Sequence, residues 1–328
     1  MVSVTPPPSG RESGRGLAIT RTVVFFATYA LASQAEYTTT VLTLKLWNTT
    51  PAVAVFAICW HTLLLFLALW AHWMCTLSDP GRVPLIHDEQ VAEDAIRYGF
   101  TDCPRCKSVR PRRAHHCSVC KRCILHMDHH CPWIGNCVGL FNQKFFIQYT
   151  GYVCITGTTE LAITSVVGYE MYQLYNNDAS LLLRKYGASW MVASIVLYFL
   201  AIVFTMFTFT LFVDQIYNLY RNTSSIDKLK RIPPREQSFI QTLTHVFGSR
   251  PSWKWLLPLP MKPHYISKTL SLSDIIALSV FDDTDAVLAD RNHEFMGLTD
   301  DTTDTPRRRQ WLPKCKWRCR KKQNANNT

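Results

Sequence analysis

Residues 103–146 read CPRCKSVRPRRAHHCSVCKRCILHMDHHCPWIGNCVGLFNQKFF, and this stretch decides the fold. Seven of the chain's twelve cysteines lie within residues 103–137. Thiolate and imidazole groups two or three residues apart are the usual ligands of tetrahedral zinc in a short loop. Strongly apolar segments flank the stretch on both sides. The sequence therefore predicts a small zinc-stabilised domain joined to membrane-spanning helices.

Long apolar blocks elsewhere in the chain predict these spans. Hydrophobic residues make up 48% of the 328 residues and are concentrated rather than spread periodically. A helix needs about 20 mostly apolar residues to cross a bilayer. The ranges with enough apolar length are 22–42, 52–74, 145–167 and 190–213. We expect an α-helical integral membrane protein with four transmembrane helices, and a zinc domain of about residues 101–146 in the linker 75–144 between the second and third.

The first and third of these ranges are only moderately hydrophobic and contain one acidic residue each, Glu36 and Glu160. An acidic side chain within a span usually faces the interior of a helix bundle or lies near the membrane surface. We interpret both glutamates as inward or boundary residues that form hydrogen bonds, in preference to a catalytic part.

Lysine and arginine are distributed unevenly around the spans. Residues 1–21 hold three of them, the segment 97–144 holds nine against two acids, and the loops after the first and third spans hold few. Because basic loops stay in the cytosol, we expect the N-terminus, the zinc domain and the C-terminal region 214–328 on that side. The cytosol is reducing, so the clustered cysteines are expected to be metal-bound or reactive thiols rather than disulfides.

The C-terminal region reverses the sign of its charge. Residues 271–305 contain nine acids and one basic residue, whereas the nine basic residues from Pro306 onward account for most of the net charge of +11. A basic tail of this kind could bind anionic lipid, bind nucleic acid, or stay solvated without a partner. Beside a membrane, and without a recognisable reader module, lipid is favoured and no nucleic-acid partner is expected. Cys315 and Cys319 in the tail are either unmodified thiols or acylation sites. No internal repeat is visible in the sequence.

Two Cys3His zinc sites would use six cysteines and two histidines. The six cysteines outside the Asp-His-His-Cys run are enough, which leaves Cys131 free. The spacing alone does not choose among the histidines, which are His115, His116, His126, His129 and His130. A loop this rich in Arg, Pro and Lys has too few apolar residues to form a hydrophobic core, so we expect the metal to be structural.

Cys131 follows Asp128-His129-His130, so a carboxylate, an imidazole and a thiol lie within four residues. A thiol is a poor nucleophile until an imidazole accepts its proton, and an aspartate can hold that imidazole in the required tautomer. The alternative is that Cys131 is a further zinc thiolate and His129 a polar surface residue. The first interpretation predicts an enzyme and the second a zinc-stabilised membrane scaffold, whereas a four-span carrier would need more polar residues along the spans.

Residues 103–146 closely resemble the DHHC-type protein S-acyltransferase family, the membrane enzymes that attach fatty acyl chains to cysteines. Asp79-Pro80-Gly81 matches the family's Asp-Pro-Gly motif. The run Asn222-x-Ser224-Ser225-Ile226-Asp227 is similar to its Thr-Thr-x-Glu motif, with serine and aspartate as conservative replacements. Thr242-x3-Val246-Phe247-Gly248 is similar to its Asn-x3-Val-Phe-Gly element, with threonine in place of asparagine.

This resemblance implies a protein-cysteine S-palmitoyltransferase that works through an acyl-enzyme on Cys131, with His129 as the base and Asp128 holding it. It implies acyl-CoA, such as palmitoyl-CoA, as the donor, and protein substrates with membrane-proximal cysteines. It also implies an endomembrane location such as the endoplasmic reticulum, the Golgi or the vacuole.

The resemblance further implies how the two structural zinc ions are bound. One set of ligands is Cys103, Cys106, His116 and Cys123, and the other is Cys117, Cys120, His130 and Cys137. Arg110, Arg113 and His115 match positions near the CoA phosphates, with a general basic surface facing the membrane as the alternative. Trp133 would line the acyl chain near the thioester, or else anchor the domain at the membrane interface.

Overall fold

The computed structural model describes residues 11–86, 89–97, 99–235, 237–248 and 251–260. The acidic segment, the basic tail and the tail cysteines Cys315 and Cys319 lie outside the described residues.

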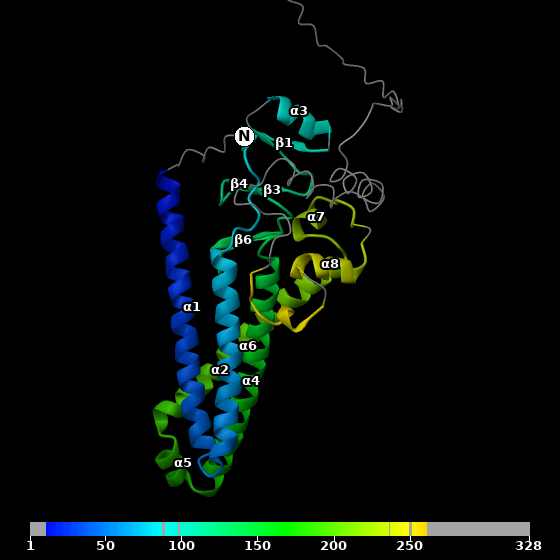
Figure 1. Cartoon of the computed structure of the whole chain (residues 1–328). Coiled ribbons are helices and arrows are strands. Elements are labelled where there is room, and N and C mark those ends of the chain that lie inside the picture. The colour runs from blue at the N-terminus through cyan, green and yellow to red at the C-terminus, as the bar shows by residue number, and fades with distance from the viewer. Residues whose placement is uncertain (1–10, 87–88, 98, 236, 249–250, 261–328) are drawn as a thin grey trace, which may run out of the picture. The chain divides into compact units, whose positions relative to one another are not determined.

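Four long helices form the main part of the described chain. They are α1 (Arg11–Leu46), α2 (Pro51–Leu77), α4 (Gln143–Asn177) and α6 (Ala188–Tyr220). Helix α4 packs along both α2 and α6, and α1 packs against α2 (Figure 1). Each range expected to span the membrane lies within one of these helices. Among the described residues, α2 and α6 are long and apolar enough to cross a membrane.

Small residues allow the closest helix pair to form. A Cβ atom added to Gly157 of α4 would lie 2.1 Å from the hydroxyl oxygen of Thr205 on α6, which no real contact allows. A Cβ on Gly151, also on α4, would lie 3.1 Å from Phe212 of α6. Close approach at small residues is a common way for helices to pack where lipid surrounds them. The short helix α5 (Ala179–Lys185) then connects α4 to α6, and Asp178 caps it by accepting from Ser180 N–H.

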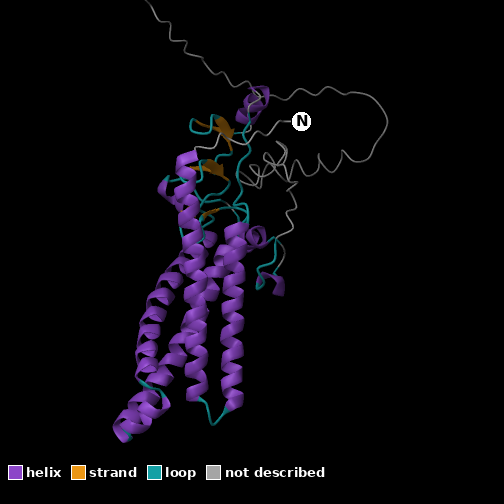
Figure 2. Ribbon diagram, turned by 90° about the vertical axis from the view of Figure 1, so that its left-hand side faces the viewer, coloured by secondary structure: helices purple, strands orange, loops and turns teal. Residues whose placement is uncertain are grey.

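The cysteine-rich segment folds into three antiparallel hairpins, drawn with orange strands in Figure 2. The paired strands are β1 (Thr101–Cys103) with β2 (Ser108–Arg110), β3 (His115–Cys117) with β4 (Arg122–Ile124), and β5 (His129–Cys131) with β6 (Asn136–Val138). Each strand has three residues, and a hairpin this short is not stable on its own in water. Helix α3 (Glu89–Arg97) packs against β2. The hairpins therefore depend on the metal sites and on contact with the long helices.

The third hairpin is fixed to the end of α2 by amide side chains. Asn136 Nδ2 donates to the carbonyl oxygen of Ser78 at 2.9 Å, just past the end of α2. Asn142 Nδ2 donates to the carbonyl oxygens of Cys137 at 2.8 Å and Cys75 at 3.3 Å. Both asparagine side chains are buried, so the hairpin and the helix end form one rigid junction.

The chain after α6 returns to the same junction. It forms α7 (Ser225–Leu229), α8 (Phe239–Phe247) and the single 3-10 turn η1 (Trp253–Trp255). Ser238 and Gln241 form a capping box at the start of α8, and Gly248 ends that helix in the left-handed conformation. Gln148 of α4 donates to the carbonyl oxygens of Trp255 and Leu257, which holds the segment against α4.

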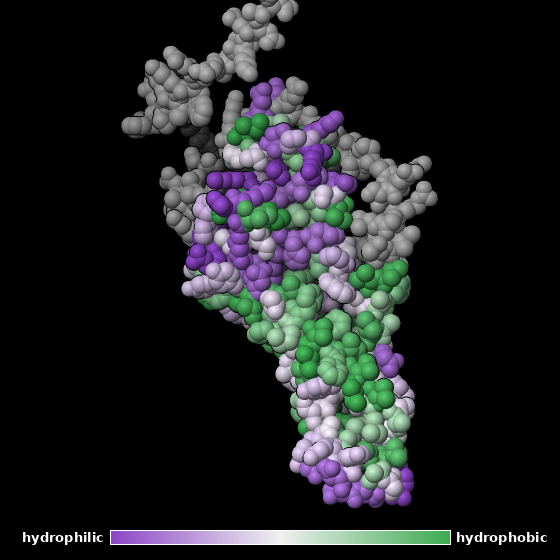
Figure 3. Space-filling model, turned by 180° about the vertical axis from the view of Figure 1, so that it is seen from behind, coloured by the Kyte–Doolittle hydropathy of each residue, from purple (hydrophilic) through white to green (hydrophobic). Residues whose placement is uncertain are grey.

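The outer surface separates into polar and apolar zones. On the face shown in Figure 3, hydrophobic side chains gather over the long helices, with hydrophilic surface above and below. Large apolar side chains on the outside of α2 and α6 include Phe56, Phe66, Phe199 and Val203, which are 58–71% exposed. A surface of this kind suits lipid contact rather than water.

Candidate active site

Two groups of cysteine and histidine side chains have the geometry of zinc sites. The ligand atoms of each group lie within 4.8 Å of one another, and the groups are Cys103, Cys106, His116 and Cys123, and Cys117, Cys120, His130 and Cys137. These are the sets that the family resemblance implied.

The distances within each group fit a tetrahedral ion. Zn–S bonds of about 2.3 Å and Zn–N bonds of about 2.0–2.1 Å require S···S and S···N separations of about 3.8 and 3.5 Å. In the first group, Cys106 Sγ lies 3.7 Å from Cys123 Sγ and 3.2 Å from His116 Nδ1. In the second, Cys137 Sγ and Cys120 Sγ lie 3.5 and 3.4 Å from His130 Nδ1. The residues present therefore fit two structural zinc ions.

The three hairpins repeat one design at an interval of 14 residues, which the sequence analysis missed. The first strands end at Cys103, Cys117 and Cys131, which are 14 residues apart. The turns of the hairpins contain positive-φ residues at the same interval: Lys107, Lys121 and Gly135. Each zinc site joins the Cys-x2-Cys turn of one hairpin to a histidine and a cysteine that face each other across the next. Losing either site should therefore disturb both.

This repeat explains why Cys131 is not a metal ligand in the arrangement observed. Cys131 occupies the position that a zinc cysteine takes in the first two hairpins, but Ile134 replaces the second cysteine of the turn. Among the residues that the structure describes, no further hairpin follows the third to supply the other two ligands. Cys131 is a free thiol, 4% exposed, at the end of β5.

Asp128 and His129 accompany this thiol. His129 Nδ1 lies 2.8 Å from Asp128 Oδ2, so the carboxylate holds the Nδ1–H tautomer and leaves Nε2 as the proton acceptor. Burial by itself would lower the pKa of His129, but hydrogen bonds to Asp128 and Cys131 raise it to about 9. The ring of Phe146 packs edge-on against the imidazole, with centroids 5.1 Å apart. The three groups therefore lie close enough to act together, and their roles as nucleophile, base and orienting carboxylate stay a prediction.

Three further groups hold Asp128, and the sequence analysis did not identify two of them. Gln215 Nε2 donates to Asp128 Oδ2 at 2.8 Å, Asn218 Nδ2 donates to Oδ1 at 3.3 Å, and the Ser225 N–H donates to Oδ1 at 2.7 Å. Burial opposes the ionisation of Asp128, yet the bonds from His129 and Ser225 lower its pKa. Gln215 and Asn218 are polar residues three apart near the end of the apolar helix α6. This polar pair in an otherwise apolar helix is the sequence feature from which their role could have been predicted.

Two of the three basic residues predicted near CoA, Arg113 and His115, lie beside Asp227, the acid of the second family motif. Arg113 Nη1 donates to Asp227 Oδ2 at 2.8 Å, and His115 Nε2 lies 3.0 Å from Asp227 Oδ1. Both basic side chains are buried, 4% and 3% exposed. Arg110 lies nearer the first metal site, with Nη1 3.9 Å from Cys123 Sγ. The observed contacts of Arg113 and His115 join the zinc domain to α7, and contact with CoA stays a prediction for all three.

Asp227 is strongly acidic in this position. Burial would raise the pKa of its carboxyl, but the hydrogen bond from His115 and the charge and hydrogen bond of Arg113 lower it to about 2. Because Ser225, two residues earlier, donates its N–H to Asp128, the second family motif connects the two buried acids. The Asp-Pro-Gly motif also has a local role: Asp79 accepts from the N–H of Gly81 at 2.8 Å in the left-handed turn after α2.

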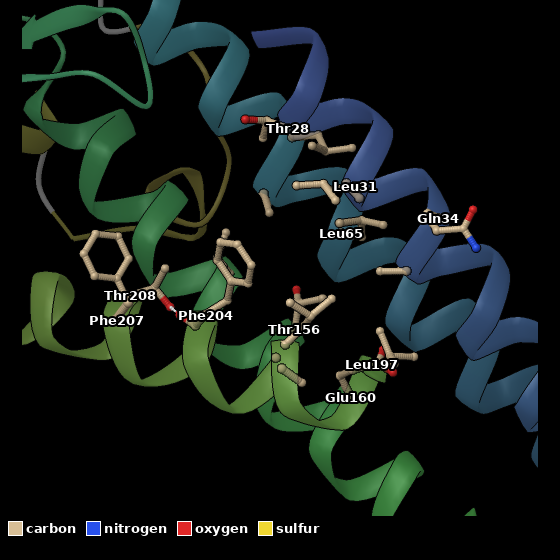
Figure 4. Close-up of a pocket in the computed structure, with 18 of the residues that line it drawn as sticks. Thr28, Leu31, Gln34, Leu65, Thr156, Glu160, Leu197, Phe204, Phe207 and Thr208 are labelled. Carbon is tan, nitrogen blue, oxygen red and sulfur yellow. Dashed lines mark hydrogen bonds between the residues drawn. The ribbon is translucent and has the colours of Figure 1, made fainter. Parts of the chain in front are cut away.

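A cavity of about 500 Å³ extends from Cys131 between the long helices. Trp133 lines it near the thiol, and its ring lies 6.3 Å from that of Phe207 on α6. His72 Nε2 lies 3.2 Å from the Trp133 carbonyl oxygen, a contact the sequence analysis did not foresee. In Figure 4, Phe204 and Phe207 lie at one end of the cavity and Glu160 and Leu197 at the other. Its walls are mostly apolar, as a site for an alkyl chain requires.

Comparison with known proteins agrees with this geometry. The pattern of the DHHC palmitoyltransferase family matches residues 98–232. The chain is 35% identical to palmitoyltransferase ZDHHC3-A of Danio rerio over 60% of this chain and 63% of that protein. It is 35% identical to palmitoyltransferase ZDHHC3 of Homo sapiens over 60% of this chain and 67% of that protein. It is 32% identical to probable protein S-acyltransferase 12 of Arabidopsis thaliana over 61% of this chain and 71% of that protein.

The structure combines two Cys3His groups that fit zinc, a free thiol beside an imidazole and a carboxylate, and long apolar helices. These features are those of a membrane protein with structural metal sites. The chain belongs to the DHHC palmitoyltransferase family. The resemblance found in the sequence is thereby confirmed. The chain spans about two thirds of the length of the relatives it matches.

Proposed function

We propose that this protein is an S-palmitoyltransferase that moves a long-chain acyl group from acyl-CoA to protein cysteines through an acyl-enzyme on Cys131. The observation that carries the proposal is the position of Cys131. Its thiol lines the start of an apolar cavity and interacts with His129, which Asp128 orients. A scaffold that only bound partners would need the zinc sites but not this arrangement.

The first half-reaction forms the acyl-enzyme. His129 Nε2 accepts the thiol proton of Cys131, and Asp128 stabilises the resulting imidazolium through Nδ1–H. The thiolate attacks the thioester carbonyl carbon of acyl-CoA, so a new S–C bond forms and the C–S bond to CoA breaks. The proton on His129 passes to the departing CoA sulfur. The alkyl chain lies in the cavity, where apolar walls replace water.

The second half-reaction transfers the chain to the substrate. His129 accepts the proton of a membrane-proximal protein cysteine, whose sulfur attacks the acyl-enzyme carbonyl. The C–S bond to Cys131 then breaks, and Cys131 recovers its proton from His129. Trp133 lines the cavity beside the reacting thioester, which is the role proposed for it.

The metal sites are proposed to be structural. The first set (Cys103, Cys106, His116, Cys123) and the second (Cys117, Cys120, His130, Cys137) would each hold one zinc ion. Bound zinc would supply the folding energy that three-residue strands lack. The ligands fix the hairpin that presents Cys131, and no proton transfer passes through them.

The proposed topology has four spans, near residues 22–42, 52–74, 145–167 and 190–213, with both termini and the zinc domain in the cytosol. The apolar surface over the helices in Figure 3 and the basic linker support it. In this orientation Cys131 faces cytosolic acyl-CoA at the membrane surface. We propose that Arg110, Arg113 and His115 attract the anionic CoA head group. An endomembrane location is proposed from the family resemblance.

Labelling with radioactive palmitoyl-CoA tests the nucleophile. Purified full-length protein in detergent should carry hydroxylamine-sensitive label, and Cys131→Ser should carry none. Cys75→Ser is the matched control, because Cys75 is another buried thiol in the same apolar cluster. Equal thioester label in Cys131→Ser and the parent would remove the proposal.

A further inference from the structure

The segment after α8 lies along the first turns of α4, and we call its residues 252–260, SWKWLLPLP, the strap. Figure 1 draws it in yellow beside the end of α4 nearest the zinc domain. Because residues four apart share one face of a helix, side chains at this spacing on α4 can hold the strap together. Three of them donate to its carbonyl oxygens: Lys144 to Leu259, Gln148 to Trp255 and Leu257, and Tyr152 to Leu256.

The backbone of the strap is hydrogen-bonded without water. The N–H groups of Trp255, Leu256, Leu257 and Leu259 all donate to carbonyl oxygens within the strap, at 2.7–3.3 Å. Pro258 has no N–H. The carbonyl oxygens of the same four leucine and tryptophan residues accept from α4. A loop in water can leave such groups to the solvent, but backbone at membrane depth needs these partners, because lipid offers no hydrogen bonds.

The exposed side chains of the strap are of the kinds found at a membrane surface. Trp253 and Leu256 are 66% and 65% exposed. Lys254, which is also exposed, is the only charged residue of the strap. Trp255 is half-buried instead, and its ring stacks on Phe247 of α8 with centroids 4.7 Å apart. Tryptophan and leucine with a basic residue and no acid are typical of segments that lie in the interface between water and lipid.

The strap also lies at the depth of this interface. In the proposed topology α4 enters the bilayer near residue 145, so the ammonium group of Lys144 lies at the level of the lipid head groups. Tyr152 follows two turns later on α4, a rise of about 12 Å from Lys144. The polar layer on each side of a bilayer is about 5–8 Å thick. The strap therefore extends from the head groups at Leu259 to the edge of the hydrocarbon at Leu256.

We propose that the strap is a membrane-docking surface, which lies in the cytosolic head-group layer with the side chains of Trp253 and Leu256 inserted among the lipids. The inference rests on the proposed topology, because α4 must cross the bilayer near residue 145. The partner is the bilayer and not another protein, since the strap lies against a helix that lipid surrounds and its backbone is already paired. Through the stacking of Trp255 on Phe247, the docked strap holds α8 at the membrane surface.

Photocrosslinking to lipid tests the docking surface. The photoreactive amino acid p-benzoylphenylalanine replaces Trp253 in the full-length protein, which is reconstituted in phosphatidylcholine nanodiscs and irradiated. Mass spectrometry of the labelled peptide should find a lipid adduct, attached to the glycerol or the upper acyl carbons. The same probe in place of Leu256 is the second variant, in case the first does not fold. Absence of a lipid adduct at both positions, or an adduct to protein alone, overturns the proposal.

Two controls make the test decisive. Leu229 of α7 is 83% exposed but lies beside the contacts of α7 with the zinc domain, so the probe there should give only background. As much lipid adduct at Leu229 as at Trp253 also overturns the proposal. Val203, 63% exposed in the middle of α6, should give an adduct lower on the acyl chain. Absence of an adduct even there contradicts the proposed topology and the strap with it, whereas labelling of Cys131 in the same samples tests acyl transfer separately.

Discussion

The buried pair between Arg113 and Asp227 gives the sharpest test of how the zinc domain is held on the helices. Asp227→Ala leaves the Arg113 guanidinium, 4% exposed, without the carboxylate that lies 2.8 Å away. Removing one partner of a buried ion pair costs about 3–5 kcal/mol, because the remaining charge stays buried. His115 loses the same acid. We therefore expect Asp227→Ala to unfold at a clearly lower temperature and to acylate Cys131 more slowly.

The assay is thermal unfolding of the detergent-purified protein, followed by palmitoyl-CoA labelling at a temperature where the variant is folded. Arg184→Ala is the control: its 3.8 Å pair with Asp178 is exposed and should contribute about 0–1 kcal/mol. Replacing both Arg113 and Asp227 with leucine should cost less than the sum of the single changes, since no buried charge remains. A parent-like unfolding temperature for Asp227→Ala would refute the assigned role of the pair.

The Arg113–Asp227 pair also predicts that the stability of the fold depends on pH. The pKa of Asp227 is about 2 in the folded protein, below the unfolded value of about 3.9. A group with a lowered folded pKa stabilises the fold above its unfolded pKa, and this stabilisation is lost as the pH falls toward 2. Asp227→Asn should therefore lose less stability than the parent between pH 4 and about 2, as measured by unfolding at each pH.

Two further predictions concern the groups around the thiol. Gln215→Leu removes the 2.8 Å hydrogen bond to Asp128, and we expect the rate of Cys131 acylation to fall about tenfold with the KM for acyl-CoA unchanged; an unchanged rate would show that the amide does not position the acid. Cys137→Ser removes a ligand of the second metal group, and metal analysis should find both zinc ions reduced because the hairpins share their sites; retention of one full zinc equivalent would contradict the interleaved arrangement. In the same measurement Cys131→Ser should keep both ions.

The metal ligands show how much of the site could be predicted from the sequence. The cysteine count left Cys131 free, but the choice of His116 and His130 came from the family resemblance and not from spacing. Folding brings these histidines to the cysteines because each faces a cysteine across its own hairpin. The interval of 14 residues was present in the sequence, but the third copy lacks one cysteine and was not recognised without the strand pairing.

The sequence by itself determined the four long apolar ranges, the grid of cysteines and histidines, and the thiol beside Asp128 and His129, because these depend on local spacing and composition. Only the tertiary structure decided that Gln215 and Asn218 hold Asp128, that Arg113 and His115 bind Asp227, and that His61 lies between two glutamates. These partners come from segments 25 to 114 residues apart. Such contacts arise from the packing of helices and hairpins, and periodicity along the chain does not predict which faces of these elements will pack together.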